Sequence, residues 1–398
     1  MGFYARYSGE EDMIKNITIQ GFKSVYDVRL DLGRVNVFIG PNGSGKSNIL
    51  EAVGVLSAAA KGRVDDESLR YRGVRPGLPA LYKSSFVSDK TPPHIMLEAR
   101  SDDEVDFRVA LLNPLEEPKP AWSFKTEHLS VGAKELVSDG VRNKKINPEA
   151  GRTALKMADS SPGSPEYRTM TDLQGYAIYC PNTPTLRGLV PDPQSREPLG
   201  LAGGRLAEAF EELKMMVPNV GDDVLEMIDW ASNVSVTRYV SNILSPSVPR
   251  TDKTIRFTDR FMRDSRNTLS ASDASEGALY ILFYGILALS SKSPGFFAVD
   301  NFDQTLNPRM ASHLTSKFCA WILSKASPQV LLTAHNPAVL DGLDLSNQNI
   351  RLFVVDRNNK GHTSVRRLEA SPELIKLNEQ YPLSRLWMMG HLGGVPDV

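Results

Sequence analysis

The sequence predicts an α/β protein with a mixed central sheet, antiparallel strands at its N-terminal side and a helical lobe. Three observations predict this class. Two alternating apolar segments precede a buried strand, a glycine-rich loop follows that strand, and strands alternate with helices in the last third of the chain. Alternation of this kind implies right-handed parallel crossovers, so we expect part of the sheet to be parallel.

Two strands are expected before the glycine-rich loop. Residues 14–19 and 28–32 alternate apolar and polar side chains, with a turn expected at Gly21 and a break at Gly33. We expect these two strands to form an antiparallel pair. Residues 35–39 are almost continuously apolar, which is typical of a strand that is buried on both faces.

The glycine-rich loop is the most informative stretch of the chain. Residues 40–47 read GPNGSGKS, fit the phosphate-loop pattern GxxxxGK[ST], and are followed by a helix-competent run at 48–53. Glycines let successive N–H groups point at one phosphate, and a helix N-terminus adds partial positive charge. Lys46 would reach the β- and γ-phosphates, and the Ser47 hydroxyl would ligate Mg²⁺. The flanking strand and helix favour this interpretation over a plain glycine turn.

The middle of the chain is less regular. A β-hairpin is expected from 95–99 and 105–112, and residues 113–170, rich in Pro, Gly, Ser and Lys, are expected to form short strands and loops. Further expected elements are a strand at 176–179, helices at 206–216 and 224–231, and a strand at 254–257.

The last third is clearer. Its expected elements are an apolar helix at 278–289, a buried strand at 296–299, a helix at 310–324, and buried strands at 329–333 and 352–355. Two polar residues follow these strands. Asp300 ends one of them and would hold Mg²⁺ opposite Ser47, although, taken alone, an acidic cap of a core strand fits better. His335 lies just past another, at the sheet edge where ligands bind, although it also fits a structural cap.

A further anion site is expected where the apolar helix begins. Residues 272–277 read SDASEG, and a serine hydroxyl with the N–H groups that follow it forms an anion-binding helix N-terminus. The alternative is an ordinary N-cap of a core helix, made by Ser275 or Asp273.

In this order, the motifs resemble those of the ABC-type ATPase heads, specifically the SMC/RecF-like and OLD-like branch of prokaryotes. The likeness covers 13–56 and 268–356, and it includes the opening segment 17–24, with its Gly-Phe-Lys-Ser run. In that family a signature sequence opens a helix, matched here by Ser275-Glu276-Gly277. A Walker B strand, a D-loop matched by 306–308 and a switch histidine matched by His335 then follow.

The resemblance implies an ABC-ATPase head in which two copies meet face to face and trap two ATP molecules with Mg²⁺. ATP then joins the two copies, and hydrolysis or release lets them part. The implied ligands of ATP are Asn42, Gly43, Ser44, Gly45, Lys46 and Ser47 of one copy, with Ser275, Glu276 and Gly277 of the other. The implied metal ligands are Ser47 and Asp300, and the implied catalytic residues are Asp300, Asn301 and His335.

The chain departs from the family directly after Asp300, where Asn301 stands in place of the usual glutamate. An amide orients water but cannot take its proton, so we expect slow hydrolysis. Alternatively, the asparagine was introduced by mutation to trap ATP. Asp303 is a candidate to replace the missing glutamate, although the sequence does not set the direction in which its side chain points. Gln174 is the weak candidate for the glutamine of the Q-loop.

Composition limits the function classes and the organisation. The net charge of −1 provides no global basic field for nucleic acid, and the basic run 142–145 fits a solvated loop better than a phosphate contact. Two cysteines outside any C-x-x-C pair favour the cytoplasm, and no apolar run is long enough to span a bilayer. The expected units are a flexible tail at 1–12, ATPase lobe I with Walker A and a β-rich insertion at 13–165, a helical lobe II with an insertion at 166–267, and the C-terminal ATPase part at 268–398.

Three functions follow from these expectations. The first is an ATPase that dimerises on ATP and gates a separate effector, a nuclease or toxin, in prokaryotic defence. The others are a RecF-like DNA-repair ATPase that clamps DNA, and a scaffold that binds ATP without hydrolysis, which Asn301 favours. A transporter subunit is a weaker fourth, because the distance from Walker A to the signature is too long and no membrane segment is found.

Overall fold

The structure is a computed structural model that describes residues 13–112, 117–138, 147–157, 159–217, 220–238, 252–325 and 328–392. The expected tail at 1–12 and the basic run at 142–145 lie outside the described residues.

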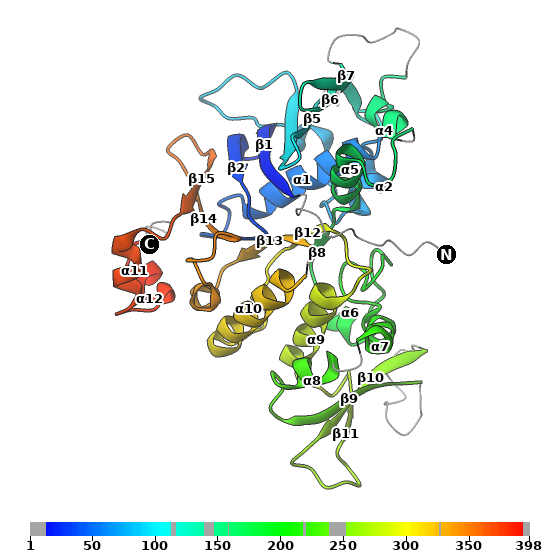
Figure 1. Cartoon of the computed structure of the whole chain (residues 1–398), viewed down its shortest axis with the longest axis vertical. Helices are drawn as coiled ribbons and strands as arrows, with labels where there is room; N and C mark the ends of the chain where they lie inside the picture. The colour runs from blue at the N-terminus through cyan, green and yellow to red at the C-terminus, as the bar shows by residue number, and fades with distance from the viewer. Residues whose placement is uncertain are drawn as a thin grey trace.

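A six-stranded mixed sheet forms the centre of the molecule (Figure 1). Its order is β15 (Thr363–Leu368), β14 (Ile350–Arg357), β3 (Val35–Ile39), β13 (Gln329–Ala334), β12 (Phe296–Val299) and β8 (Ile178–Tyr179). All neighbours are parallel except β14 and β15, which pair antiparallel. The mixed central sheet that the sequence predicts is therefore confirmed. Its parallel strands bring the ends of β3, β12 and β13 to one edge, where the candidate site lies.

A second six-stranded sheet, entirely antiparallel, lies on one side of this centre (Figure 1). Its order is β2 (Val25–Asp31), β1 (Ile14–Phe22), β4 (Ile95–Ser101), β5 (Val105–Leu112), β6 (Ser123–Val131) and β7 (Lys134–Val137). The β1–β2 pair and the β4–β5 hairpin confirm the sequence prediction.

The turn between β1 and β2 lies two residues later than expected. Gly21 has a φ of +73° but stays within β1, and Phe22 still pairs with Val25, so the turn falls on Lys23 and Ser24. Phe22 is fully buried, and its burial keeps the strand paired beyond the glycine. The displaced turn puts Lys23 and Ser24 beside the glycine-rich loop.

Helix α1 (Lys46–Ala60) is packed between the two sheets, and nearly all of its residues are buried. Alternate side chains of β3 face opposite ways, because successive residues of a strand point to opposite faces. Val35 and Val37 belong to the hydrophobic cluster on the far side of the central sheet, whereas Phe38 belongs to the cluster that contains α1. Strand β3, which leads into the glycine-rich loop and α1, is therefore packed on both faces.

The other face of the central sheet is covered by helices (Figure 1). They are α9 (Glu276–Leu289), α10 (Pro308–Leu323), the 3₁₀ helix η1 (Pro337–Gly342), α11 (Pro372–Asn378) and α12 (Leu383–Met388). Eleven consecutive residues of α9, 278–288, are buried, so this helix is apolar on every side, as a core helix should be.

The segment that was expected to be a helical lobe contains helices and a small sheet. The helices are α5 (Pro165–Gly175), α6 (Thr183–Leu186), α7 (Leu206–Met216) and α8 (Val220–Leu225), and β9 (Ala231–Arg238), β10 (Lys253–Asp259) and β11 (Thr268–Ser270) form a three-stranded antiparallel sheet. The remaining short helices are α2 (Asp66–Arg70), α3 (Pro79–Tyr82) and α4 (Arg152–Met157).

The expected helix at 224–231 is wrong, because α8 ends at Leu225 and β9 begins at Ala231. Tight turns with bonds from residue i to i−3 connect them, such as Met227 N–H to the Val224 carbonyl. Such turns bury apolar residues at the same spacing as a helix, so the pattern alone did not separate the two.

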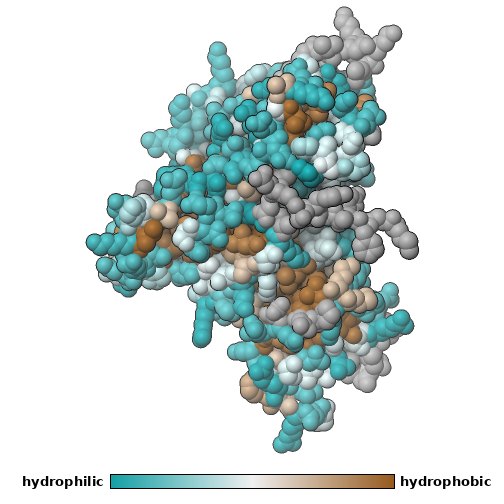
Figure 2. Space-filling view, viewed as in Figure 1, coloured by the Kyte–Doolittle hydropathy of each residue, from teal (hydrophilic) through white to brown (hydrophobic). Residues whose placement is uncertain are grey.

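Hydrophilic residues cover most of the face shown in Figure 2, and hydrophobic residues gather in the region of α9. In the part of the chain that the structure describes, no helix combines the length and apolarity needed to cross a bilayer.

Candidate functional site

The glycine-rich loop joins β3 to α1 and has one crowded side and one open side. A Cβ on Gly40 would lie 2.0 Å from the Val355 carbonyl oxygen, and one on Gly45 would lie 2.0 Å from Thr363 Oγ1. A Cβ on Gly43 would meet nothing within 4 Å. Gly43 and Gly45 have φ values of +76° and +109°, which L side chains rarely adopt. The β14–β15 hairpin therefore supports one side of the loop, and the other side is free for a ligand.

Lys46 lies within this loop and is almost fully buried. Its Nζ donates to the carbonyl oxygens of Gly40 at 2.7 Å and Pro41 at 3.0 Å, and it lies 3.4 Å from His335 Nδ1. Burial lowers the pKa of Lys46 to about 8, although the charges of Asp300 and Asp303 act in the opposite direction. The charge of this ammonium group is therefore sensitive to any anion placed beside it.

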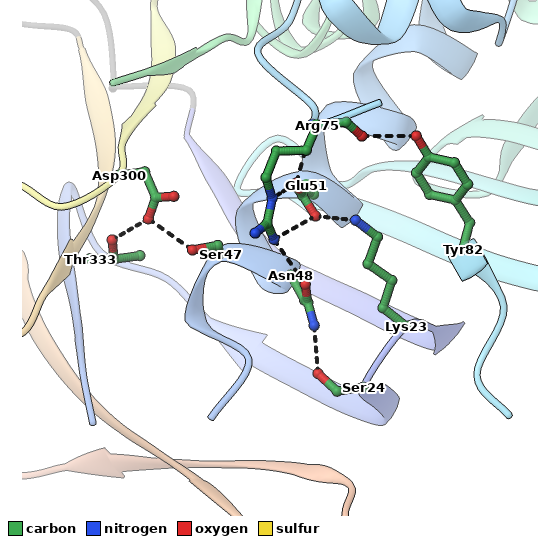
Figure 3. Close-up of polar contacts among 9 residues, drawn as sticks. All are labelled: Lys23, Ser24, Ser47, Asn48, Glu51, Arg75, Tyr82, Asp300 and Thr333. Atoms are coloured by element: carbon green, nitrogen blue, oxygen red, sulfur yellow. Dashed lines mark hydrogen bonds and ion pairs between the residues drawn. The ribbon is translucent and has the colours of Figure 1, made fainter. Parts of the chain in front are cut away.

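Asp300, at the end of β12, connects two other segments of the site (Figure 3). Its Oδ1 accepts hydrogen bonds from the Ser47 hydroxyl at 3.0 Å and from the Thr333 hydroxyl at 2.5 Å. The sequence prediction placed Ser47 and Asp300 opposite each other, and the structure brings them into contact. The contribution of Thr333 was missed, because a threonine within a buried strand carries no distinctive sequence signal.

Ser47 and Asp300 fit a magnesium ion by their chemistry. Both present hard oxygen ligands at one point, and Mg²⁺ binds through one or two carboxylates together with phosphate oxygens and water. Among the described residues, no group of three or more His, Cys, Asp and Glu side chains could hold a metal ion on its own. The residues present thus suit a metal shared with a phosphate ligand rather than a site built from protein alone.

His335 follows β13 and is held there by Asp303. The Asp303 carboxylate accepts the backbone N–H groups of His335 at 3.0 Å and Asn336 at 2.5 Å. Burial and the charge of Lys46 lower the pKa of His335, against the opposing charges of Asp303 and Asp300. The lowered pKa favours the neutral form of the His335 ring, and Asp303, whose carboxylate is occupied by these N–H groups, positions the histidine loop.

Asn301 has a left-handed backbone with a φ of +57°. Asparagine is among the few residues with a side chain that adopt this conformation readily. Its N–H donates to Thr333 Oγ1 at 2.9 Å, so the hydroxyl that binds Asp300 also fixes the backbone of the next residue. In the D-loop segment, the Asn307 side chain caps α10 by accepting the Met310 N–H at 2.9 Å.

The segment at the start of α9 leaves its serine available. Ser275 is the N-cap residue of α9, but its side chain makes no capping hydrogen bond and is exposed. Asp273 does not cap the helix either, since its Oδ2 accepts from the backbone and the hydroxyl of Ser270. A Cβ on Gly277 would meet nothing within 4 Å. The first turn of α9 thus presents free N–H groups, an unbonded hydroxyl and open space.

Gln174 is not brought to the site. Its side chain donates to the Ala60 carbonyl at 3.0 Å, and Ala60 is the last residue of the helix that Lys46 begins. A fifteen-residue helix separates these ends by about 20 Å. The suggestion that Gln174 is the Q-loop glutamine is therefore wrong.

A charged cluster beside the site was missed by the sequence reasoning (Figure 3). Glu51 is 2% exposed and accepts from Lys23 Nζ at 2.5 Å and Arg75 Nε at 2.6 Å. Burial raises the pKa of Glu51, but the bonds from Arg75 and Lys23 outweigh burial and hold it below its usual value. The signal in the sequence was Glu51 itself, a charged residue in an otherwise apolar helix.

Two segments match models of protein families. Residues 13–118 match the model described as "AAA ATPase domain", and residues 215–341 match the one described as "AAA domain, putative AbiEii toxin, Type IV TA system". These segments include the glycine-rich loop, Ser275, Asp300 and His335.

Two curated proteins are similar over parts of the chain. The chromosome partition protein Smc of Desulfitobacterium hafniense is 60% identical over 42 residues, which are 10% of this chain and 4% of that protein. The DNA replication and repair protein RecF of Lactococcus lactis is 29% identical over 111 residues, 27% of this chain and 29% of that protein. The matches therefore cover less than a third of the length of either relative.

A solved structure resembles nearly the whole chain. It is an Smc head bound to the C-winged-helix domain of ScpA, with a TM-score of 0.55 and 12% identity over 91% of this chain and 99% of that one. At this identity the likeness establishes the fold. The chain has the fold of an SMC head and carries segments that match ATPase domains.

Proposed function

We propose that this chain, which has the fold of an SMC head and two segments that match ATPase domains, joins two copies of itself around ATP. One observation carries the proposal: Lys46, Ser47, Asp300 and His335 converge beside the open side of the glycine-rich loop. A lysine and a hydroxyl beside a carboxylate are the groups with which a phosphate-loop enzyme holds the phosphates and Mg²⁺, and His335 adds a ring that can reach the terminal phosphate.

Each residue of one copy has a defined role in this proposal. The N–H groups of Asn42, Gly43, Ser44 and Gly45 cradle the phosphates, and Lys46 exchanges its carbonyl partners for phosphate oxygens. Ser47 and Asp300 hold Mg²⁺, which neutralises charge on the phosphates when bound. His335 contacts the terminal phosphate through a neutral ring, and Asp300 keeps its orientation through Thr333.

Asn301 gives the site its slow rate. Its amide orients the attacking water but accepts no proton, so hydrolysis proceeds by positioning and charge stabilisation without a general base. The Ser47 hydroxyl donates to Asp300 and does not replace that base, and Asp303 is committed to the His335 and Asn336 N–H groups.

The second copy completes the pocket. Ser275, Glu276 and Gly277 of one copy face the terminal phosphate held by Lys46 of the other, where the first turn of α9 supplies partial positive charge and free N–H groups. The exposed, unbonded Ser275 hydroxyl and the open space at Gly277 support this arrangement. A ligand that binds only the joined state well shifts the population towards dimers.

The dimer gates a separate effector, a nuclease or a toxin, in prokaryotic defence. The description of the family matched by residues 215–341, which names a toxin of a toxin–antitoxin system, supports this role. We place the protein in the cytoplasm, where the two unpaired cysteines stay reduced.

The experiment compares ATP binding and phosphate release by the unchanged chain, by Lys46→Ala and by Lys61→Ala. Lys61 directly follows α1 and is exposed, which makes it a matched control. We expect Lys46→Ala to abolish binding and Lys61→Ala to bind as the unchanged chain does. Normal binding by Lys46→Ala would refute the proposed site.

A DNA-clamping ATPase is the second candidate, and the similarity to RecF favours it. It predicts that double-stranded DNA stimulates phosphate release, whereas an effector gate does not. A scaffold that binds ATP without hydrolysis is the third, and Asn301 favours it. It predicts ATP-driven dimers with no phosphate release.

A further inference from the structure

A chain of hydrogen bonds runs behind the glycine-rich loop and joins four separate segments. Arg75 Nη2 donates to Asn48 Oδ1 at 3.3 Å, and Asn48 Nδ2 donates to Ser24 Oγ at 2.7 Å (Figure 3). The Ser24 hydroxyl lies 2.7 Å from Thr363 Oγ1, which donates to the Ser44 carbonyl at 2.8 Å. The chain thus begins at an arginine and ends inside the phosphate loop.

Counting protons gives this chain a single direction. A hydroxyl has one hydrogen to donate, and Thr363 uses it on the Ser44 carbonyl, so Ser24 must donate to Thr363. Ser24 has no second proton, which requires Asn48 to present its NH₂ group to Ser24 and its oxygen to Arg75. Every donor therefore points towards the loop, and a one-way chain of this kind strengthens each of its bonds.

We propose that this donor chain sets the conformation of the phosphate loop, and that Thr363 and Ser24 are positioning residues for the nucleotide. The inference rests on the proposed ATP site. Thr363 is 3% exposed and Ser24 is 6% exposed, so a broken link leaves a buried polar group without a partner. A Cβ placed on Gly45 would lie 2.0 and 2.7 Å from these same two hydroxyl oxygens, so both hydroxyls also pack directly against the loop.

The position of the donor chain explains why these residues affect nucleotide binding. Thr363 and Ser24 lie on the crowded side of the loop, opposite the open face at Gly43, so neither of them contacts the ligand. A loop held in its binding conformation before the ligand arrives avoids an ordering cost on binding. Loss of the donor chain should therefore weaken nucleotide affinity and raise KM, with a smaller effect on kcat.

The test measures the Kd of a fluorescent ATP analogue, KM, kcat and the melting temperature for Thr363→Val, Thr363→Ser and Ser24→Ala. Thr363→Val removes the last donor and keeps the shape, whereas Thr363→Ser keeps the donor. Ser364→Ala, an exposed neighbour on β15, is the control. We expect Thr363→Val to raise Kd and KM about tenfold, and Thr363→Ser and Ser364→Ala to stay within about twofold of the unchanged chain.

Ser24→Ala provides a second test of the donor chain if Thr363→Val does not fold. We expect it to raise Kd by several-fold with a smaller change in kcat, and the double variant to lose less than the sum of the two single losses, because both act through one chain of hydrogen bonds. Unchanged Kd in either folded single variant would overturn the inference, as would failure of Thr363→Ser to retain affinity. Lys46→Ala separates the two proposals, since normal ATP binding by that variant refutes the site itself.

Discussion

Asp303 holds the backbone of His335, because its carboxylate accepts the His335 N–H at 3.0 Å and the neighbouring Asn336 N–H at 2.5 Å. Asp303 is 8% exposed, and its hydrogen bonds to these two N–H groups are partly buried. The candidate general base considered from the sequence is in the structure a clamp on the histidine loop.

Asp303→Ala should therefore impair both stability and turnover. Two partly buried N–H groups lose their charged acceptor, which costs about 1–3 kcal/mol of unfolding free energy, and His335 loses its fixed position. Chemical denaturation and phosphate release measure the two effects, with the exposed neighbour Gln304→Ala as the control. Unchanged stability in Asp303→Ala would show that the clamp is not formed.

Nucleotide affinity should fall as the pH rises above about 8. Burial lowers the pKa of Lys46 to about 8, and bound phosphates raise it again because they favour the charged form. Below that pH, Lys46 is charged with and without nucleotide and contributes no pH dependence. Above it, the free chain has lost the proton that the bound chain retains, so binding must take up a proton.

The measurement for Lys46 is the Kd of ATP across this range, which should rise by up to about tenfold per pH unit above pH 8. The Lys61→Ala variant should show the same slope. A Kd that stays flat between about pH 7 and pH 9.5 would contradict a lowered pKa at Lys46.

Asn301→Glu should raise the rate of phosphate release. A carboxylate at this position can take the proton of the attacking water, and we expect an increase of about tenfold or more. The gain is limited by the left-handed backbone at φ +57°, which suits asparagine better than glutamate. Asn301→Gln has the same length without the base and should stay slow. A rate in Asn301→Glu no higher than in Asn301→Gln would mean that this position does not face the water.

Sequence reasoning could predict the parts of the fold whose signals are local. The alternation in β1 and β2, the loop pattern ending in Lys46 and Ser47, and the buried strands before Asp300 and His335 all depend on residues close together in the chain. The contact between Ser47 and Asp300 also followed, because parallel strands end at one sheet edge.

The parts that were missed depend on contacts between distant segments. Nothing near Thr363 in the sequence indicates that its hydroxyl reaches Ser44, 319 residues away. The clamp of Asp303 on the His335 loop and the pairing of Arg75 with Glu51 are of the same kind. The placement of Gln174 failed for this reason too, since its position along the chain did not reveal which end of α1 it would meet.

The central claim is that ATP lies between two copies, and the solution mass of the chain with ATP and Mg²⁺ tests it most directly. Ser275→Arg fills the exposed start of α9 without touching the loop around Lys46, so it should bind ATP and remain monomeric. The account predicts that the unchanged chain doubles its mass on adding ATP and that Ser275→Arg does not. ATP bound by an unchanged chain that stays monomeric, or an ATP-dependent dimer that Ser275→Arg leaves intact, would contradict it.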